Sequence, residues 1–355
     1  MDRSKVHEII ENYDLDRISI ATLGSHSALQ ILHGAKLEGF TTVLIVERRR
    51  LWFYNQFRHL IDHTLVVDSW REVVSKNIMN RLRSMNSILI PHGSFVEYVG
   101  LDRAESMEIP MFGLRGLLRI EADQRRKMKF LADAGIKIPK EYSINNVVPP
   151  VIVKFPGAKG GKGYFIANSI EDVKKGIERA IKQGIIQNPD EALIQEYIVG
   201  VPAYYHFFYS PVLDRLELLG ADIRYESNVD GLKRLPAEIS KYIDPSFVVV
   251  GNIPLVLRES LLPKIMDYGL KFVRKSKEDL PPGIIGPFCL ESIIREDCEI
   301  IVFEFSGRIV AGTNIYVMGS PYSWLYWDEP MSTGRRIARE IRMAIDRGIL
   351  DLILT

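Results

Sequence analysis

The sequence predicts an α/β protein in which an N-terminal Rossmann-like domain, built on a parallel sheet, is followed by two further lobes. Near the start of the chain, the buried-strand pattern RISIAT (17–22) precedes an amphipathic helix to about Glu38 and then the strand TTVLIVE. A strand, a helix and a strand in this order predict a parallel sheet. From about residue 200 onward, short runs rich in β-branched and aromatic residues follow one another, which predicts a second, strand-rich region.

Composition and charge exclude several classes of protein. A chain of 355 residues, 46% of them hydrophobic, predicts a globular protein of two or three domains. The net charge of +1 argues against a broad nucleic-acid surface, and the basic clusters at 48–50 and 125–127 are short enough to be solvated faces. The polar start is not a signal peptide, and no apolar stretch has the length of a membrane span. We therefore expect a cytoplasmic protein with neither nucleic acid nor a membrane as partner.

Cysteine and histidine usage predicts no zinc site. The two cysteines, Cys289 and Cys298, provide neither a disulfide framework nor a Cys-based zinc site, as suits a reducing cytoplasm. His59 and His63 have the i, i+4 spacing of a helix, but no HExxH motif and no convincing third ligand accompany them.

Two loops at the carboxyl edge of the parallel sheet carry serine and histidine. Gly24, Ser25 and His26 follow the first strand, and His92 and Ser94 follow the strand pattern SILIP. In such folds ligands bind at the carboxyl ends of the strands, where the free N–H groups of a helix N-terminus can hold a phosphate. These residues are therefore candidates for an anion site. The alternative is that Ser25 and Ser94 only cap their helices.

The stretch VIVKFPGAKGGKGYFIA (151–167) places two short apolar runs around a loop of lysines and glycines. Glycines let backbone N–H groups approach an anion closely, and the lysines add positive charge. The loop lacks the spacing of a Walker A or a dinucleotide-binding motif, so we interpret it as another kind of phosphate clamp. The alternative is a solvated turn. The residues of the clamp are Lys154, Gly157, Lys159, Gly160, Gly161, Lys162 and Gly163.

Proline and glycine residues divide the rest of the chain. A helix that begins near Glu121 and the pair Pro149 and Pro150 precede the clamp, whereas a helix at about 170–183 and the strand ALIQEYIVG follow it. The predicted domains are 1–120, 121–198 and 199–355. Strands are expected in the third domain at 205–209, 216–224, 246–252, 288–294 and 300–309.

Two glutamates interrupt apolar runs in the third domain. Glu291 in FCLES and Glu304 in VFEFSGR are separated by a polar turn at 295–299, which predicts an antiparallel hairpin with the two acids on neighbouring strands. Burying carboxylates without compensation is costly, and a divalent cation between them resolves the cost. Magnesium that holds nucleotide phosphates is the usual case. The alternative for either glutamate is a side chain that points to solvent.

The clamp and the acidic hairpin together resemble the ATP-grasp enzymes, in which a strand, a flexible Gly/Lys loop and a strand cover the triphosphate. The order Glu304, Ser306, Arg308 is similar to the E-x-N-x-R ending of these enzymes, where the acid and the amide bind metal and the arginine stabilises an acyl phosphate. Here Ser306 replaces the Asn. The resemblance implies a Rossmann-like pre-ATP-grasp domain followed by a two-lobed ATP-grasp fold. It also implies Mg²⁺ or Mn²⁺ as cofactor and ATP as co-substrate.

Seven motifs narrow the resemblance, and they occur in order from about Arg17 to the end of the chain. They are GSHSALQILHGAKLEGF, GAKGGKGYF, RYESNVDGLKRLPA, GNIPLVLRESLL, GPFCLE, SGRIVAGTNIYVMGSPYSWL and MSTGRRIAREI. Together they resemble the archaeal 5-formaminoimidazole-4-carboxamide ribonucleotide synthetases. The resemblance implies a carbon–nitrogen ligase of purine (IMP) biosynthesis, which uses ATP and formate to formylate 5-aminoimidazole-4-carboxamide ribonucleotide (AICAR) through formyl phosphate.

The resemblance also implies roles for individual residues. Lys154 and Arg308 would act in catalysis, and Glu291 and Glu304 would bind the metal. The positions that match ATP contacts are Lys154, Lys159, Gly160, Gly161, Lys162, Gly163, Gln195, Glu196, Tyr197, Ile198 and Glu226. The positions for AICAR are His26, Ser94 and Asn252, together with Gly24 and Ser25 of the first loop.

Two positions depart from the ATP-grasp pattern. Gln124 stands where many of these enzymes have a lysine for the α-phosphate, so Arg125 or Lys127 would have to replace it. The residues at 195–198 match the hinge strand that borders adenine in these enzymes. The acid that often holds the ribose just after this hinge is absent, and Val201 and Pro202 occupy that region.

Two other functions are open at this point. One is a different ATP-grasp ligase that joins another carboxylate to another amine, and the other is a non-catalytic nucleotide sensor. The presence of Lys154, Glu291, Glu304 and Arg308 argues against the sensor.

Two aromatic clusters have different explanations. The run at 204–209 is expected to pack in the core rather than to stack on nucleic-acid bases. The family resemblance implies a homo-oligomer, and side chains of the second cluster are candidates for its contacts. These are Tyr322, Trp324, Tyr326 and Trp327.

Overall fold

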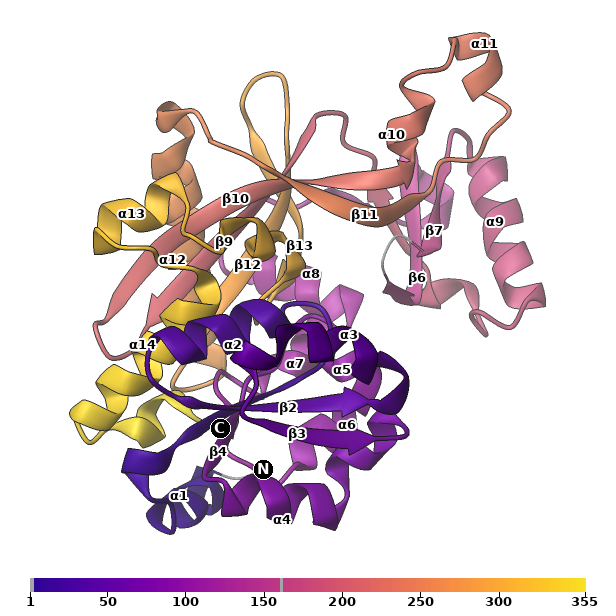
Figure 1. The fold of residues 1–355 in the computed structure, drawn as a ribbon. Coiled ribbons are helices and arrows are strands. Elements are labelled where there is room, and N and C mark those ends of the chain that lie inside the picture. Colours follow the sequence, from indigo (N-terminus) through magenta and orange to yellow (C-terminus); the bar gives the residue numbers. More distant parts are fainter. Residues whose placement is uncertain (1–2, 160–161) are drawn as a thin grey trace.

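A computed structural model describes residues 3–159 and 162–355 of the chain. Its strands form three sheets, which are a parallel sheet near the N-terminus, a small antiparallel sheet and a larger antiparallel sheet (Figure 1). In this view the large sheet lies above the N-terminal layer, and the small sheet stands to the right of the large one.

The N-terminal sheet has the strand order β3-β2-β1-β4, and all its strands are parallel. β1 (Ser19–Leu23) is buried along its whole length, and β2 (Thr41–Glu47) is buried apart from its first residue. Strands covered on both faces read as continuous apolar runs, which is why the sequence pattern identified both. The other elements are β3 (His63–Val67), β4 (Ser87–Leu89), α1 (Arg3–Glu11), α2 (Ala28–Leu37), α3 (Leu51–Tyr54), α4 (Lys76–Ser84), α5 (Phe95–Val99) and α6 (Leu101–Ser106).

The small lobe carries the predicted clamp. Its sheet has the order β5-β8-β6-β7, in which β6 (Val151–Lys159) and β7 (Lys162–Ala167) form the hairpin of the Gly/Lys loop. α9 (Ile170–Lys182) packs closely on this sheet. The ring of Phe165 lies so near Gly176 of this helix that a Cβ atom there would collide with it. The remaining elements of this segment are α7 (Leu117–Glu121), α8 (Gln124–Asp133), β5 (Glu141–Tyr142) and β8 (Leu193–Glu196).

The large sheet has the order β11-β10-β9-β12-β13, with antiparallel pairs throughout. Its central strand β9 (Val201–Ser210) buries the aromatic run at 204–209 in the core, as predicted. The long helix α12 (Leu262–Asp279) covers this sheet, where Phe272 stacks on Phe288 with 4.7 Å between ring centres. The other elements are β10 (Arg215–Asn228), β11 (Phe247–Pro254), β12 (Gly286–Ile294), β13 (Ile300–Ser306), α10 (Val229–Leu232), α11 (Ala237–Ser240), α13 (Pro321–Trp327) and α14 (Thr333–Asp346).

The last helix returns to the N-terminal layer. α14 crosses α2 so closely that their backbones are in contact. A Cβ atom at Gly34 would collide with the main chain of α14, and one at Gly334 would collide with the main chain of α2. A single β-bridge also joins His92 to Ile309. The end of the chain thus contributes to the core of the N-terminal layer, and the division into 1–120, 121–198 and 199–355 stays a prediction.

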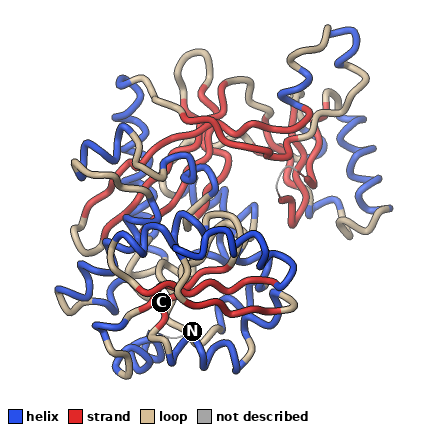
Figure 2. Tube along the Cα trace, viewed as in Figure 1, coloured by secondary structure: helices blue, strands red, loops and turns tan. Residues whose placement is uncertain are grey.

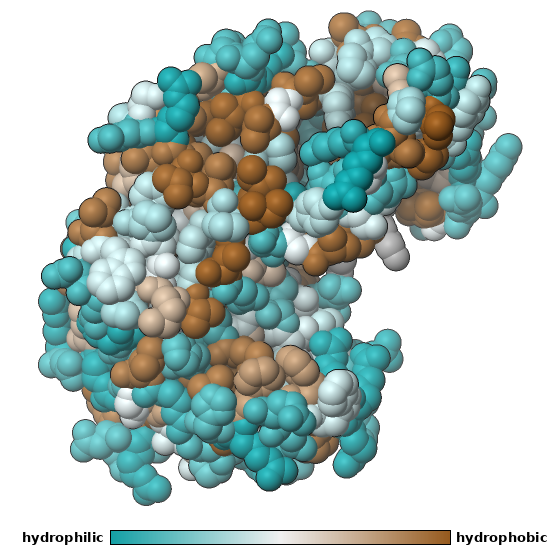
Figure 3. Space-filling view, turned by 45° about the horizontal axis from the view of Figure 1, so that its top comes forward, coloured by the Kyte–Doolittle hydropathy of each residue, from teal (hydrophilic) through white to brown (hydrophobic). Residues whose placement is uncertain are grey.

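A cleft separates the small lobe from the N-terminal layer. The space-filling view shows the hollow on one side of the molecule (Figure 3). The tube shows strands of the large sheet running from above the N-terminal layer to the small lobe (Figure 2). The large sheet therefore connects the two parts of the molecule that border the hollow.

The expected end of one strand is wrong, and two further details concern candidate residues. β8 ends at Glu196 rather than at Gly200, and α5, the helix after Ser94, has only five residues. His59 lies in a 3₁₀ helix and His63 begins β3, so the two histidines do not share a helical face.

The described part of the chain contains neither a cluster of metal ligands nor a membrane-spanning helix. Within 3–159 and 162–355, no group of three or more His, Cys, Asp or Glu side chains is arranged to hold a metal ion. None of the helices in these ranges has the length and apolar character needed to cross a membrane.

Candidate active site

The two predicted metal ligands lie opposite each other across a strand pair. Glu291 on β12 faces Glu304 on β13 in the register of the predicted hairpin. Like charges directly opposite are destabilising, and a cation from another element accompanies each carboxylate. The guanidinium of Arg224 (β10) lies 2.6 Å from Glu291, and Lys127 (α8) forms an ion pair with Glu304. The hydroxyl of Ser306 is 3.5 Å from Glu291, so it lies within reach of the same cluster.

Two buried lysines lie beside this acidic pair. Burial lowers the pKa of Lys127 and the pKa of Lys154 (β6) to about 8, because the desolvated ammonium form is disfavoured. The positive charge of Lys127 lowers the pKa of Lys154 further, whereas Glu291 raises it. The Nζ atom of Lys154 lies 5.5 Å from the ring centre of Phe303, and no described carboxylate forms an ion pair with it. A bound phosphate would supply the missing counter-charge.

Arg308 is held by an acid that the sequence analysis did not single out. Its Nη2 atom lies 2.5 Å from Glu121 at the end of α7, and the same carboxylate accepts a 3.0 Å hydrogen bond from the backbone N–H of Gly307. The Nε atom of Arg308 is buried and has no partner among the described residues. Buried N–H groups are rarely left unpaired in native proteins, so this atom indicates a place for an anion.

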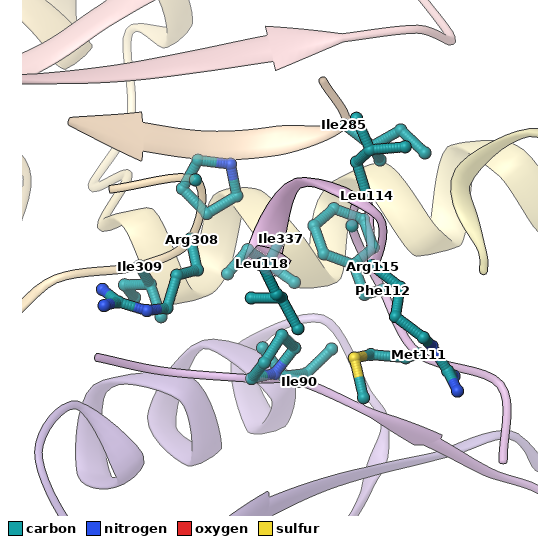
Figure 4. A pocket seen from close by; sticks show the side chains of 14 residues that line it. Ile90, Met111, Phe112, Leu114, Arg115, Leu118, Ile285, Arg308, Ile309 and Ile337 are labelled. Carbon is teal, nitrogen blue, oxygen red and sulfur yellow. The ribbon is translucent and has the colours of Figure 1, made fainter. Parts of the chain in front are cut away.

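A small apolar cavity lies at the interface of the N-terminal layer and the large sheet (Figure 4). Its volume is about 10 Å³, which is room for roughly one water molecule. The guanidinium groups of Arg308 and Arg115 lie on opposite sides of it. A nucleotide cannot fit in this cavity, so the open cleft is the candidate site.

Elements of the predicted ATP site meet beside Arg224. Burial raises the pKa of Glu226 (β10) to about 7, while the charge of Arg224 lowers it. Burial also raises the pKa of Tyr164 (β7) and the pKa of Tyr197, and the charge of Glu226 adds to both shifts. The clamp hairpin, the hinge at 195–198 and strand β10 therefore lie within electrostatic range of one another.

The hinge contains an amide without a partner. Gln195 is buried, and neither its amide oxygen nor its amide nitrogen has a hydrogen-bond partner among the described residues. Adenine offers an N–H donor beside a ring acceptor, which matches the two functions of such an amide. Glu196 is engaged by Arg295 at 3.1 Å, and Tyr197 and Ile198 follow the end of β8.

Part of the predicted clamp lies outside the described residues. This holds for Gly160 and Gly161, and for the side chains of Lys159 and Lys162, whose backbones pair across the hairpin. Gly163 has a φ of 86°, in the region that favours glycine. The phosphate contacts of this loop therefore stay a prediction.

The N-terminal layer brings His26 to the same place. This residue has the left-handed φ of 52°, and its ring stacks on the ring of His92 with 5.4 Å between centres. The protein atoms around His26 desolvate its ring and so lower its pKa, although the residue as a whole is exposed. The nearby charges of His92 and of two arginines, Arg308 and Arg224, lower this pKa further. This lowered pKa favours the neutral form of His26, which lies within electrostatic range of Arg308 and Arg224.

Arg50 lies beside the first loop, and the expectation that the cluster at 48–50 is a solvated face is wrong for this residue. Its Nη1 atom donates a 3.0 Å hydrogen bond to the hydroxyl of Ser25. Its guanidinium lies over the rings of Trp70 and Tyr98, at 5.8 and 5.7 Å. A cation held in this way favours an anion next to the loop.

The idea that the two serines only cap helices is wrong. Ser94 precedes α5, but its side chain makes no capping hydrogen bond. Ser25 does not precede α2 directly, because Ser27 occupies that position. Since α5 has only five residues, its dipole is weak, and an anion here depends on side chains more than on the helix N-terminus.

Asn252 on β11, the third predicted AICAR contact, pairs directly with Arg224 in the register of the large sheet. Its side chain is half-buried and donates a 2.7 Å hydrogen bond from Nδ2 to Asp222 on β10. Residues that are directly opposite in an antiparallel pair share a face. Asn252 therefore lies on the same face as the arginine that holds Glu291.

Of the two candidates for the missing α-phosphate lysine, only Lys127 faces the acidic pair. Arg125 forms an ion pair with Glu141 and donates a 2.8 Å hydrogen bond to the carbonyl of Ala192, so its guanidinium is engaged elsewhere. The amide oxygen of Gln124 is buried and has no partner within the described chain.

Comparison with known proteins identifies the family. Two family models match, one described as "Protein of unknown function (DUF1246)" at residues 20–142 and one as "Domain of unknown function (DUF1297)" at residues 172–355. The 5-formaminoimidazole-4-carboxamide-1-(beta)-D-ribofuranosyl 5'-monophosphate synthetase of Ignicoccus hospitalis is 57% identical over 351 residues, which cover 99% of each chain. The chain belongs to this synthetase family.

Solved structures agree with the assignment to the synthetase family. The IMP biosynthesis protein PurP from Thermococcus kodakaraensis has a TM-score of 0.76 and 35% identity, over 95% of this chain and 100% of that one. The ADP complex of an N5-carboxyaminoimidazole ribonucleotide synthetase has a TM-score of 0.63 and 14% identity, over 92% and 77% of the two chains. The latter likeness concerns the fold alone. The predicted ATP-grasp fold and the predicted family are both confirmed.

Some residues of this site in the synthetase were not predicted. The position of Arg224 could have been inferred from the sequence. Asp222, Arg224 and Glu226 occupy alternate positions of one strand, so their side chains share a face of the sheet. The role of Glu121 could not be inferred in this way, because its partner Arg308 lies far away in the sequence.

Proposed function

We propose that this member of the synthetase family joins formate to AICAR. ATP, formate and AICAR give the formylated nucleotide, ADP and phosphate, which is a carbon–nitrogen ligation in IMP biosynthesis. The observation that carries the proposal is the convergence of the acidic pair, buried Lys154, Arg308 and His26 at one place. The full-length similarity to synthetases of this name supports the choice of substrates.

ATP is proposed to bind between the clamp hairpin and the large sheet, with adenine against Gln195 and Glu226 near the ribose. Glu291 and Glu304 fit Mg²⁺ or Mn²⁺, because one or two carboxylates together with nucleotide phosphates are the usual ligands of such a cation. When bound, the cation neutralises phosphate charge. Lys127, which pairs with Glu304 here, would contact a phosphate of the bound nucleotide, in place of the lysine missing at Gln124.

The first chemical step transfers the γ-phosphoryl group to formate. A formate oxygen forms a bond to the γ-phosphorus while the bond from phosphorus to the leaving oxygen of ADP breaks, which yields formyl phosphate. The protein contributes positioning and positive charge rather than a covalent group. Lys154 and Arg308 supply that charge, and the unpartnered Nε of Arg308 suits an oxygen of the transferred group.

The second step forms the carbon–nitrogen bond. The 5-amino nitrogen attacks the formyl carbon, the bond from that carbon to the phosphate oxygen breaks, and the nitrogen loses a proton as inorganic phosphate leaves. An aromatic amine is a weak nucleophile, so holding it next to formyl phosphate contributes more than a strong base. We propose that His26, which lies within electrostatic range of Arg308, hydrogen-bonds the base of AICAR during this step.

The rest of AICAR is proposed to lie against the N-terminal layer. Ser25, Ser94 and Arg50 would hold the 5′-phosphate, since a cation and hydroxyl groups are strong partners for it. Gly24 lets the first loop pack tightly, because a Cβ there would come within 2.9 Å of Val46. Asn252 would contact the base from the large sheet.

We further infer that the enzyme acts in the cytoplasm as a homo-oligomer. Of the second aromatic cluster, Tyr322 is buried, whereas Trp324 is 43% exposed and its neighbour Leu325 is 85% exposed. These two side chains on α13 support a contact between subunits. Light scattering should give a smaller particle for Leu325→Glu than for the wild type, and an unchanged mass would contradict a contact at this helix.

Phosphate release tests the proposed reaction. With ATP and Mg²⁺, release should require both formate and AICAR, and omitting either should reduce it to background. Acetate in place of formate, and the dephosphorylated nucleoside in place of AICAR, should be poor substrates. Phosphate release that is independent of formate would contradict the proposal.

A further inference from the structure

A buried histidine and aspartate pair lies beneath the proposed AICAR site and takes no part in the proposed chemistry. His206 (β9) and Asp222 (β10) are 2% and 1% exposed. The Nε2 atom of His206 lies 2.7 Å from Oδ1 of Asp222. Because burying ionisable groups carries a desolvation penalty, apolar residues of similar size would fill this space more favourably. The pair therefore indicates a role beyond packing.

The other carboxylate oxygen of Asp222 determines how Asn252 is turned. Nδ2 of Asn252 donates a 2.7 Å hydrogen bond to Oδ2. A carboxylate only accepts hydrogen bonds, so the NH₂ group of the amide must face Asp222 and the amide oxygen must point away. This oxygen accepts no hydrogen bond from the described residues. It is left as an acceptor on the strand position directly opposite Arg224.

A glycine closes the remaining side of Asp222. A Cβ at Gly312 would collide with Oδ1 of Asp222 and would crowd the ring of His206. Gly312 belongs to a 3₁₀ turn at Ala311–Tyr316 that packs against β10 and β11. Asp222 is thus confined by His206 and this turn, and its orientation toward Asn252 is fixed.

We propose that Asp222 is a positioning residue, which fixes the amide of Asn252 so that its oxygen accepts a hydrogen bond from an N–H group of the AICAR base. This inference rests on the proposed role of Asn252 as an AICAR contact. The base has two such groups, the 5-amino group that is formylated and the 4-carboxamide. Asn252 thereby selects a base with a donor at this place and rejects a base with an acceptor, because two facing acceptors repel each other.

A double-mutant cycle tests the proposal. Calorimetry measures the affinities for AICAR and for ATP in the wild type, Asp222→Asn, Asn252→Ala and the double variant. Asp222→Asn keeps the shape of the side chain but adds a donor, so the amide of Asn252 loses its single orientation. AICAR affinity should fall about tenfold, with ATP affinity unchanged. In the Asn252→Ala background the same substitution should change AICAR affinity by less than about twofold, because the residue through which Asp222 acts is absent.

Glu217 provides the matched control. It is a fully buried acid on the same strand, but it pairs with Arg336 rather than with a residue of the proposed site. Glu217→Gln should shift the urea midpoint and leave AICAR affinity unchanged. The proposal is overturned if the double variant loses AICAR affinity by the product of the two single losses. Asp222 would then act independently of Asn252, through the general structure only.

An analogue of AICAR with a 4-carboxylate identifies the N–H group. If Asn252 faces the carboxamide, the wild type should bind the analogue more weakly than AICAR, and Asn252→Ala should narrow this gap. The 5-amino group is the donor if Asn252→Ala lowers the affinity for both ligands and leaves the ratio of the two affinities as it is in the wild type.

The same cycle distinguishes a failure of this inference from a failure of the proposed function. An unchanged AICAR affinity in Asn252→Ala overturns the positioning role, while formate- and AICAR-dependent phosphate release in the wild type would still support the ligase. Wild-type protein that neither binds AICAR nor releases phosphate in its presence would overturn both.

Discussion

Glu291 and Glu304 face each other across β12 and β13, and each carboxylate is met by a cation from a different part of the chain. Arg224 comes from the same sheet, whereas Lys127 comes from α8. The two cations offset the repulsion between neighbouring carboxylates. If Glu304 binds a divalent cation as proposed, we expect that cation to compete with Lys127 for the carboxylate.

Replacing Glu304 tests the metal site. Glu304→Gln should keep the fold but reduce turnover by about 100-fold or more, because a charged metal ligand and its electrostatic stabilisation of the transition state are lost. Electron paramagnetic resonance should also show weaker Mn²⁺ binding in the presence of ADP. Glu299→Gln, in the turn of the same hairpin, is the control and should bind Mn²⁺ normally. Near-normal turnover of Glu304→Gln at saturating Mg²⁺ would contradict the assignment.

Replacing Lys154 tests the separation of the two nucleotide sites. Lys154→Met should weaken ATP binding by about tenfold or more, because the buried ammonium is proposed to pair with a phosphate. AICAR affinity should change little, since AICAR is proposed to lie against the N-terminal layer. Isothermal titration of each nucleotide measures both effects, with the exposed Lys129→Met as a control. Equal losses for ATP and AICAR would argue against this division of the cleft.

Replacing Ser94 or His26 tests the AICAR site. Ser94→Ala and His26→Ala should each raise the KM for AICAR roughly tenfold, with a much smaller effect on the KM for ATP and formate. The dephosphorylated nucleoside is the control substrate, on which Ser94→Ala should lose little further activity. If Ser94→Ala discriminates against the nucleoside as strongly as the wild type, the phosphate is bound elsewhere.

Two arginines near the end of the chain are poor alternatives for that phosphate. Arg336 is fully buried between Glu217 and Glu340, and Arg335 lies 2.6 Å from Glu38. Their guanidinium groups already have carboxylate partners, so we expect Arg335→Met to leave the KM for AICAR unchanged. A rise as large as that for Ser94→Ala would move the phosphate to this helix.

Replacing Glu121 tests how Arg308 is positioned. Glu121→Gln should lower kcat about tenfold, because Arg308 loses its ion pair and Gly307 its charged acceptor. The dissociation constant of AICAR should stay within about twofold of the wild type, and Glu121→Asp should restore part of the rate. Glu108→Gln removes a surface ion pair with Arg83 and serves as the control. A large loss of AICAR affinity together with unchanged kcat would show that Glu121 does not act on the chemical step.

Glu226 predicts a pH dependence of stability. Burial raises its pKa from 4.5 to about 7, so between these values the folded state binds more protons than the unfolded state. The free energy of unfolding should therefore decrease as the pH rises from about 4.5 to 7. Glu226→Gln removes this contribution, so it should be more stable than the wild type at pH 7.5 and lose most of that advantage at pH 4.5. Urea unfolding at several pH values measures the difference, and the exposed Glu238→Gln should show no such trend.

The sequence by itself determined the elements that depend on local pattern. Buried strands of a parallel sheet read as continuous apolar runs, so β1 and β2 were found with nearly their observed bounds. The hairpin of Glu291 and Glu304 was predictable because a polar turn at 295–299 joins its two strands. Strand ends were less predictable, and β8 is shorter than expected, because a few residues carry a weak periodic signal.

Only the tertiary structure decided which charges meet in the cleft. Arg224 contacts Glu291 across 67 residues of sequence, and the backbone of Gly307 contacts Glu121 across 186. No local pattern encodes such contacts, because they depend on how the two antiparallel sheets and α7 and α8 are packed together. For the same reason, the confinement of Asp222 by His206 and Gly312 could not be inferred from the order of the residues. The sequence thus determined the chemical groups of the site, whereas packing between distant elements determined which of them are paired and which are left for ligands.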